Sequence, residues 1–154
     1  FCRAAGVQMH HVKPHGALYN MAAKDEKLAR AVVEGICEVD DRLTLLALSG
    51  SEMLLAAEKA GLRAASEVFA DRGYQPDGTL VPRSQPGAMI TDETLAIERV
   101  VRMVTEGVVT AVDGTDVPLR ADSICVHGDG EKALLFVRRI RAALEAKGVA
   151  LRAL

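Results

Sequence analysis

Short apolar runs alternate with longer amphipathic segments along this chain. The runs hold enough Val, Ile, Leu and Ala to form strands that are buried on both faces, at residues 7–12, 43–48, 65–69 and 123–126. The segments between the runs place apolar residues at helical spacing, as Leu28, Val32 and Ile36 do. This alternation predicts an α/β fold built on a parallel sheet, in a single domain over residues 1–154.

Capping residues and glycines set the predicted ends of the helices. Asp25 and Asp92 are typical N-cap residues, and Ser49 with Glu52 matches a capping box. Glycines predict where these helices and the last one end, at Gly61, Gly107 and Gly148. Gly6 follows two alanines, so we expect the chain to open on the end of a helix, partway through a fold.

Two segments fit neither a helix nor a central strand. Residues 71–87 are interrupted by Gly and Pro too often for either, and a loop of this length is usually functional. Residues 108–112 and 117–119, around Asp113-Gly114, predict a small hairpin. Four strands do not close a barrel, so we expect either half of a larger (β/α) barrel or a small open sheet, and the helical start favours the half barrel.

Composition argues against several classes of function. Nineteen Lys and Arg against 21 Asp and Glu give a net charge of -2 without a basic block, which argues against nucleic acid as a partner. No apolar run approaches the roughly 20 residues of a membrane helix, and no secretion signal opens the chain. The three cysteines lack metal-ligand spacing and fit reduced thiols. We therefore expect a cytoplasmic protein that makes no membrane contact.

Polar residues follow each predicted strand. Ligands bind at the carboxyl ends of the strands in parallel α/β folds, so these residues should converge on one rim. Residues 49–52 follow the second strand, and the candidates for chemistry follow the others: Lys13, His15, Tyr19, Asn20, Asp71, Arg72, Arg83, His127 and Asp129.

The residue types suggest roles on this rim. Lys13 could hold a phosphate or polarise a carbonyl, and the plain alternative is a surface lysine. His15 and His127 could move protons near neutral pH, with Asp129 as base or as the group that orients an imidazole. Arg72 or Arg83 could bind a substrate carboxylate through paired hydrogen bonds. Exposed arginines and hydrogen-bonded histidines without a function remain the alternatives.

The sequence neither establishes nor excludes a metal site. His15, His127 and Asp129 could ligate zinc or iron by residue type, but no ligand spacing supports such a site. His10 and His11 are adjacent on a strand and point to opposite faces, so we interpret both as structural. No standard phosphate-binding loop occurs, so any ATP must bind by other means.

Four stretches together resemble the LamB/YcsF family, the A subunits of 5-oxoprolinase. They are residues 11–20 (HVKPHGALYN), 67–72 (EVFADR), 80–88 (LVPRSQPGA) and 125–129 (CVHGD), in the family's order and spacing. The resemblance implies part of a distorted (β/α) barrel similar to polysaccharide deacetylases. It also implies ATP-dependent opening of the 5-oxoproline lactam to L-glutamate, with ATP as co-substrate and subunits B and C as partners.

The resemblance also ranks the candidate residues. Those expected to be catalytic are Lys13, His15, His127 and Asp129. Those expected to bind substrate are Tyr19, Asn20, Asp71, Arg72 and Arg83. Individual roles stay as hypotheses: Lys13 stabilises charge on an oxygen, His127 with Asp129 handles protons for water attack, and Arg72 or Arg83 holds the substrate carboxylate.

The sequence departs from the family in one respect. Family members carry an Asp-Leu-Asn-containing first strand ahead of this region, and about 40% of a barrel of about 250 residues has no counterpart here. We therefore expect this stretch alone to be inactive or to assemble with a complementary fragment, and a homo-oligomer is possible. Two other functions stay open, a metal-dependent amide or carbohydrate deacetylase and a non-catalytic subunit that binds the substrate.

Overall fold

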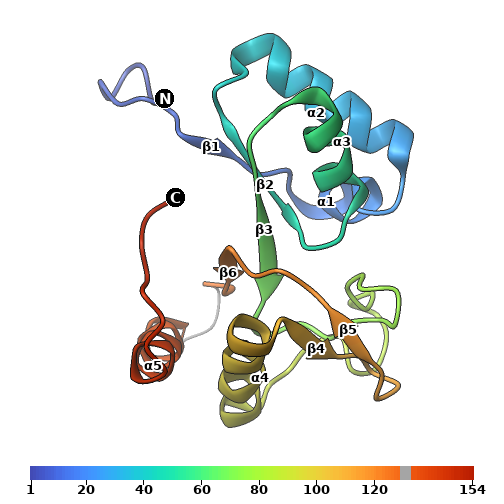
Figure 1. Cartoon of the computed structure of the whole chain (residues 1–154), viewed down its shortest axis with the longest axis vertical. Helices are drawn as coiled ribbons and strands as arrows, with labels where there is room; N and C mark the ends of the chain where they lie inside the picture. The colour runs from blue at the N-terminus through green and yellow to red at the C-terminus, as the bar shows by residue number, and fades with distance from the viewer. Residues whose placement is uncertain (129–132) are drawn as a thin grey trace. The chain divides into compact units, whose positions relative to one another are not determined.

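The sheet has four strands in the order β1-β2-β3-β6, namely His11–Val12, Thr44–Leu48, Ala64–Phe69 and Ser123–Cys125 (Figure 1). The computed structural model describes residues 1–128 and 133–154. β1 pairs with β2, and β2 with β3, in parallel. The predicted α/β class and the parallel pairing of these three strands are therefore confirmed. The barrel itself stays a prediction.

Burial differs among the strands. Every residue of β2 is buried, as its apolar run predicts, because β2 has a partner strand on each side. β1 is two residues long and partly exposed, and β6 is only half-buried. The prediction that all four strands are buried on both faces is wrong for these two. For β1 the reason is its place at the edge of the sheet, where it has a single neighbouring strand.

The chain divides into two compact units, Phe1–Glu67 and Val68–Leu154. The single domain expected over residues 1–154 therefore stays a prediction. No helix within the described residues is long and apolar enough to span a membrane.

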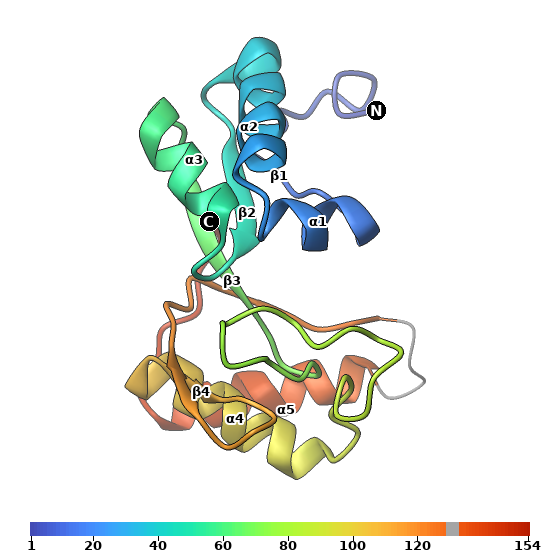
Figure 2. The ribbon, with the colours of Figure 1, turned by 90° about the vertical axis from the view of Figure 1, so that its right-hand side faces the viewer.

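In the first unit three helices accompany the strands: α1 Gly16–Ala22, α2 Glu26–Asp40 and α3 Glu52–Ala60. Asp25 caps α2 as predicted, because its carboxylate accepts hydrogen bonds from the main-chain N–H groups of Lys27 and Leu28. α2 and α3 lie side by side in both views (Figures 1 and 2). The most deeply buried large side chains of this unit are Val33, Leu45, Leu48 and Met53.

In the first unit one helix was not predicted, one expected cap is absent and one expected helix end is confirmed. Residues 16–22, for which the sequence pattern predicted no helix, form α1. The capping box does not form, because α3 starts later than predicted, with Ser51 at the N-cap, and the Ser51 hydroxyl caps nothing. Residues 1–6 form a single hydrogen-bonded turn that closes as a helix end does, because the Ala5 N–H bonds to the Phe1 carbonyl, Gly6 is left-handed and the Val7 N–H bonds to the Cys2 carbonyl. The expected glycine cap at Gly6 is therefore confirmed.

The second unit holds α4 Glu93–Glu106, α5 Ala133–Ala146, and a hairpin of β4 Val108–Thr110 with β5 Asp116–Pro118. The Asp92 cap of α4, the glycine end at Gly107 and the hairpin are confirmed. α4 and α5 pack together in this unit. Both helices contribute to one hydrophobic cluster of this unit, whose buried members are Ala70, Val100, Ile140 and Leu144.

Candidate active site

Lys13, Tyr19 and Glu67 meet in the first unit. Glu67 lies in β3 and is only 3% exposed. Its Oε1 accepts a hydrogen bond from Lys13 Nζ at 2.5 Å, and its Oε2 accepts one from the Tyr19 hydroxyl at 2.8 Å. Lys13 Nζ also lies 5.5 Å from the centre of the Tyr19 ring. Both carboxylate oxygens are thus engaged, and the lysine is held by a charge and by an aromatic ring.

Glu67 was not singled out as a site residue from the sequence, although it lies in one of the family stretches. The signal that could have found it is an acidic residue inside the apolar run of 65–69. A buried carboxylate needs a compensating partner, and the chain gives no local one. Its partner Lys13 is 54 positions away, which residue spacing alone does not show.

The other two candidates of this unit are more exposed. His15 occupies the N-cap position of α1, and its side chain makes no capping hydrogen bond. The Asn20 amide donates to the main-chain oxygen of Gly16 at 3.0 Å, one turn earlier in the same helix. Tyr19, by contrast, is 4% exposed and faces Glu67. The three candidates in and beside α1 therefore differ in exposure, since Tyr19 is buried whereas His15 and Asn20 are exposed.

Asp71, His127 and Arg83 meet in the second unit. His127 Nδ1 lies 2.6 Å from Asp71 Oδ2, and its Nε2 lies 3.1 Å from Arg83 Nη2. An ionised carboxylate only accepts hydrogen bonds and a guanidinium only donates them. The imidazole between them therefore carries its proton on Nδ1 and turns a lone pair on Nε2 toward Arg83. The Phe69 ring lies 6.0 Å from the imidazole, centre to centre.

This arrangement suits proton transfer. A carboxylate that fixes the tautomer of a histidine leaves the far nitrogen able to accept a proton. The second oxygen of Asp71, Oδ1, is buried and has no hydrogen-bond partner among the described residues. Asp71, predicted to bind substrate, is placed here as the partner of His127. Asp129, predicted to work with His127, lies outside the described residues.

Arg72 is a buried residue of the loop that leads from β3 to α4. Its Nε donates to the Ala88 oxygen at 3.0 Å and its Nη2 to the Val81 oxygen at 2.6 Å. Burial lowers the pKa of Arg72, and the nearby charge of Arg83 lowers it further. Arg72 thus ties two segments of the loop together, while Arg83 is exposed on the same loop.

The described residues offer little toward a metal centre. Among residues 1–128 and 133–154, no group of three or more His, Cys, Asp or Glu side chains is placed to hold an ion. Of the three ligands considered from the sequence, Asp129 lies outside this range. The metal site proposed from residue type therefore stays a prediction.

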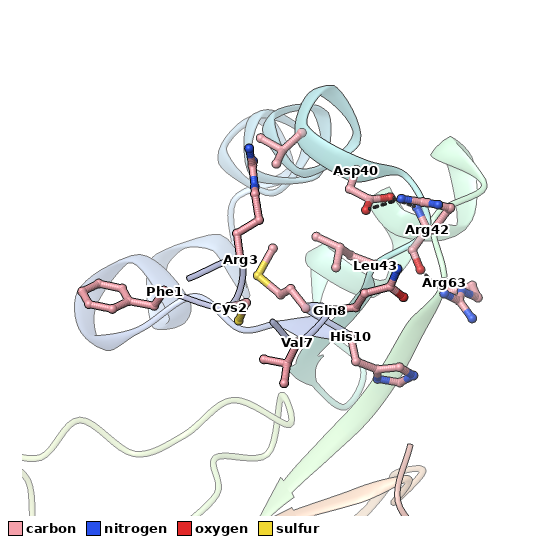
Figure 3. A pocket seen from close by; sticks show the side chains of 12 residues that line it. Phe1, Cys2, Arg3, Val7, Gln8, His10, Asp40, Arg42, Leu43 and Arg63 are labelled. Carbon is pink, nitrogen blue, oxygen red and sulfur yellow. Dashed lines mark hydrogen bonds and ion pairs between the residues drawn. The ribbon is translucent and has the colours of Figure 1, made fainter. Parts of the chain in front are cut away.

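A cavity of about 690 Å³ lies in the first unit, away from these residues (Figure 3). Its walls include Val7, Met9, Leu43 and Arg63, which precede the strands β1, β2 and β3. The cavity is therefore at the amino ends of the strands, whereas ligands of parallel α/β folds bind at the carboxyl ends. None of the candidate site residues that the structure describes lines it.

Comparisons with known proteins agree on one family. The family model described as LamB/YcsF matches residues 1–154. The chain is 60% identical over 149 residues to the 5-oxoprolinase A subunit of Clostridium beijerinckii and 52% identical over 149 residues to that of Bacillus subtilis. Both matches cover 97% of this chain and 58% of the relative. The chain thus spans less than two thirds of the length of these relatives.

A solved structure supports the same assignment. The crystal structure of a lactam utilization protein from Thermus thermophilus matches with a TM-score of 0.86 and 45% sequence identity. The match covers 99% of this chain and 61% of that chain. The fold described above is therefore the fold of the corresponding part of that protein.

Proposed function

Because the chain belongs to the LamB/YcsF family, we propose that it carries part of the active site of a 5-oxoprolinase, in the cytoplasm. The reaction would open the lactam of 5-oxoproline to L-glutamate while ATP is converted to ADP and phosphate. The names of the relatives, the A subunit of 5-oxoprolinase and a lactam utilization protein, support the substrate class. The observation that carries the proposal is the Asp71–His127–Arg83 cluster.

The substrate sets three chemical demands. Its lactam carbonyl is a poor electrophile because of amide resonance, its carboxylate is an anion that must be held, and a water molecule must lose a proton as it attacks. ATP, when bound, would supply the phosphoryl group that activates the lactam carbonyl toward attack by water. The ring C–N bond would then break, its nitrogen would take up a proton to become the amine of glutamate, and a second water would release the phosphate from the new carboxyl group. The residues of this chain would then have to bind the carboxylate, stabilise charge on oxygen and move protons.

Arg83 and His127 can together bind the substrate carboxylate and accept the proton of the attacking water. We assign the substrate carboxylate to Arg83 because its guanidinium is exposed, whereas that of Arg72 is committed to the loop. When the substrate carboxylate accepts the hydrogen bond of Arg83 in place of His127, Nε2 of His127 no longer has that donor. That nitrogen can then accept a proton from the attacking water, while Asp71 keeps the Nδ1 proton in place.

Lys13 would meet the third demand. Its ammonium, held against Glu67, is a positive group suited to stabilise charge on the lactam or phosphate oxygen. Tyr19 engages the same carboxylate, which extends its proposed role from substrate binding to support of Lys13. His15, Asn20 and Asp129 stay candidates without an assigned step. The naming of the relatives as A subunits implies further subunits, and we expect B and C to be required for turnover.

The test uses the protein assembled with its partner subunits and follows glutamate and ADP together. His127→Ala should lower kcat by about 10²- to 10⁴-fold, the range for loss of a general base. Arg83→Met should mainly raise KM for 5-oxoproline. His10→Ala is the matched control, because His10 is exposed and outside both clusters, and it should leave turnover unchanged.

Three results would contradict the proposal. Full turnover in His127→Ala would exclude its role as base. Turnover without ATP consumption that disappears with a chelator would favour the metal-dependent deacetylase. Binding of 5-oxoproline by a complex that never forms glutamate would favour a non-catalytic subunit.

A further inference from the structure

Glu67 is a buried charge within the first unit whose position is costly for stability. Removing a carboxylate and an ammonium from water costs several kcal/mol per ion, and a buried ion pair often recovers no more than that. Residues 64, 65, 66, 68 and 69 of the same strand are Ala, Ala, Ser, Val and Phe, so an apolar or small residue would suit position 67. The packing of β3 therefore gives no reason for a glutamate there.

The contacts of Glu67 point to a task performed through Lys13. Both carboxylate oxygens are used, one by Lys13 Nζ at 2.5 Å and the other by the Tyr19 hydroxyl at 2.8 Å. The Tyr19 contact fixes the rotation of the carboxylate, and the carboxylate in turn fixes the ammonium. The Lys13 side chain is 22% exposed while that of Glu67 is 4% exposed. The lysine alone of the pair is thus open enough to meet a ligand.

The three side chains come from separate elements of the unit. Lys13 directly follows β1, Tyr19 lies on α1 and Glu67 is on β3, next to Leu48 of β2 in the strand register. A lysine on a flexible stem directly after a two-residue edge strand would otherwise sample many positions. Anchoring it to the more central strand β3 removes that freedom before any substrate binds.

We propose that Glu67 is a positioning residue for lactam opening, which holds the Lys13 ammonium at the point where negative charge develops on oxygen. Tyr19 completes the arrangement by fixing the carboxylate. This inference rests on the proposed function, because it assigns Glu67 a role through the lysine of that reaction. Glu67 itself does not touch the substrate.

The experiment is a functional double-mutant cycle in the complex with the partner subunits. Lys13→Met should lower kcat by about 10²- to 10³-fold, as loss of one oxyanion-stabilising group does. Glu67→Gln, which keeps the shape and loses the charge, should lower kcat by on the order of tenfold to 10²-fold with KM nearly unchanged, because displacing a reacting group by about 1 Å can cost 10²-fold. In the Lys13→Met background, Glu67→Gln should change the residual kcat less than twofold.

Two further variants supply a milder perturbation of the Glu67 carboxylate and a matched control. Tyr19→Phe leaves the Lys13–Glu67 pair intact but releases Oε2, so it should lower kcat less than Glu67→Gln does and have no effect in the Lys13→Met background. It also serves if Glu67→Gln fails to fold, which circular dichroism would show. Glu26→Gln is the matched control, because Glu26 forms an exposed ion pair with Lys59, and it should leave kcat unchanged.

The outcomes separate this proposal from the function on which it rests. Equal losses from Glu67→Gln with and without Lys13 would overturn the positioning role alone, because a purely structural residue acts independently of the lysine. Full turnover in Lys13→Met would overturn the role of Lys13 and this proposal with it. A wild-type complex that forms no glutamate would overturn the proposed function as a whole.

Discussion

Replacing Arg72 by Met tests whether this arginine holds the loop or the substrate. The side chain is 5% exposed and donates two charged hydrogen bonds, to the main-chain oxygens of Val81 and Ala88. Hydrogen bonds to charged groups contribute about 1.5–3 kcal/mol each, so the pair could supply on the order of 3–6 kcal/mol. Met retains much of the apolar stem, and the released carbonyls regain water when the loop opens. We expect a net loss of about 2–4 kcal/mol in the free energy of unfolding.

The matched control is Arg83→Met on the same loop. Arg83 is exposed, so its replacement should change the free energy of unfolding by no more than about 0.5 kcal/mol. Arg72→Lys should recover only part of the loss, because an ammonium cannot reproduce the two-pronged geometry of the guanidinium. Replacing Arg72 should therefore lower the free energy of unfolding, whereas replacing Arg83 should weaken substrate binding.

Thermal unfolding followed by circular dichroism measures the first effect, and KM for 5-oxoproline measures the second. Arg72→Met should lower Tm by on the order of 10 °C, and Arg83→Met should leave Tm within a few degrees of wild type. An Arg72→Met protein with wild-type Tm would refute the reasoning. A folded Arg72→Met protein whose KM rises more than that of Arg83→Met would reverse the assignment of the substrate carboxylate.

Four further substitutions test individual contacts. Gly73→Ala should destabilise the protein by about 1–3 kcal/mol in urea unfolding, because its Cβ would overlap a main-chain oxygen across the loop. Ser51→Ala should leave the free energy of unfolding unchanged or raise it, since the buried hydroxyl has no partner among the described residues. Asp92→Ala should lower the free energy of unfolding by about 1 kcal/mol, because the N-cap of α4 is lost. Arg102 lowers the pKa of Asp116 to about 2, so this ion pair contributes stability above the ordinary pKa of 3.8 and loses it as pH falls toward 2. Asp116→Asn should therefore flatten the plot of Tm against pH between about pH 4 and 2.

The elements that could be predicted from the sequence are those fixed by local interactions. The carboxylates of Asp25 and Asp92 cap helices by bonding main-chain N–H groups two and three residues ahead, so a short window contains the whole interaction. β2 is predictable from its unbroken apolar run, because a strand with a neighbour on each side must be apolar throughout. In each case the residues that decide the structure are adjacent in the chain.

The elements that were missed depend on contacts between distant segments. α1 is seven residues long, too short to be stable alone, and its buried face is fixed by Tyr19 against Glu67, 48 positions away. Ser51 matches the composition of a cap, but its hydroxyl is buried without bonding a main-chain N–H. The pairing of Asp71 with His127 likewise spans 56 positions, so the sequence identified both residues without showing that they act on each other.

An interrupted apolar run nevertheless carries information about the site. Glu67 breaks the run of β3, and the cost of burying its charge means that a cation must meet it somewhere in the fold. Lys13 meets it from the position directly after β1, which lies in the same sheet as β3 and runs parallel to the intervening strand. By the same reasoning Asp71, two residues beyond β3, finds its partner in His127, which stands two residues beyond β6. Acidic residues in or just after a buried strand therefore indicate which sites exist, and the strand order indicates which partners can reach them.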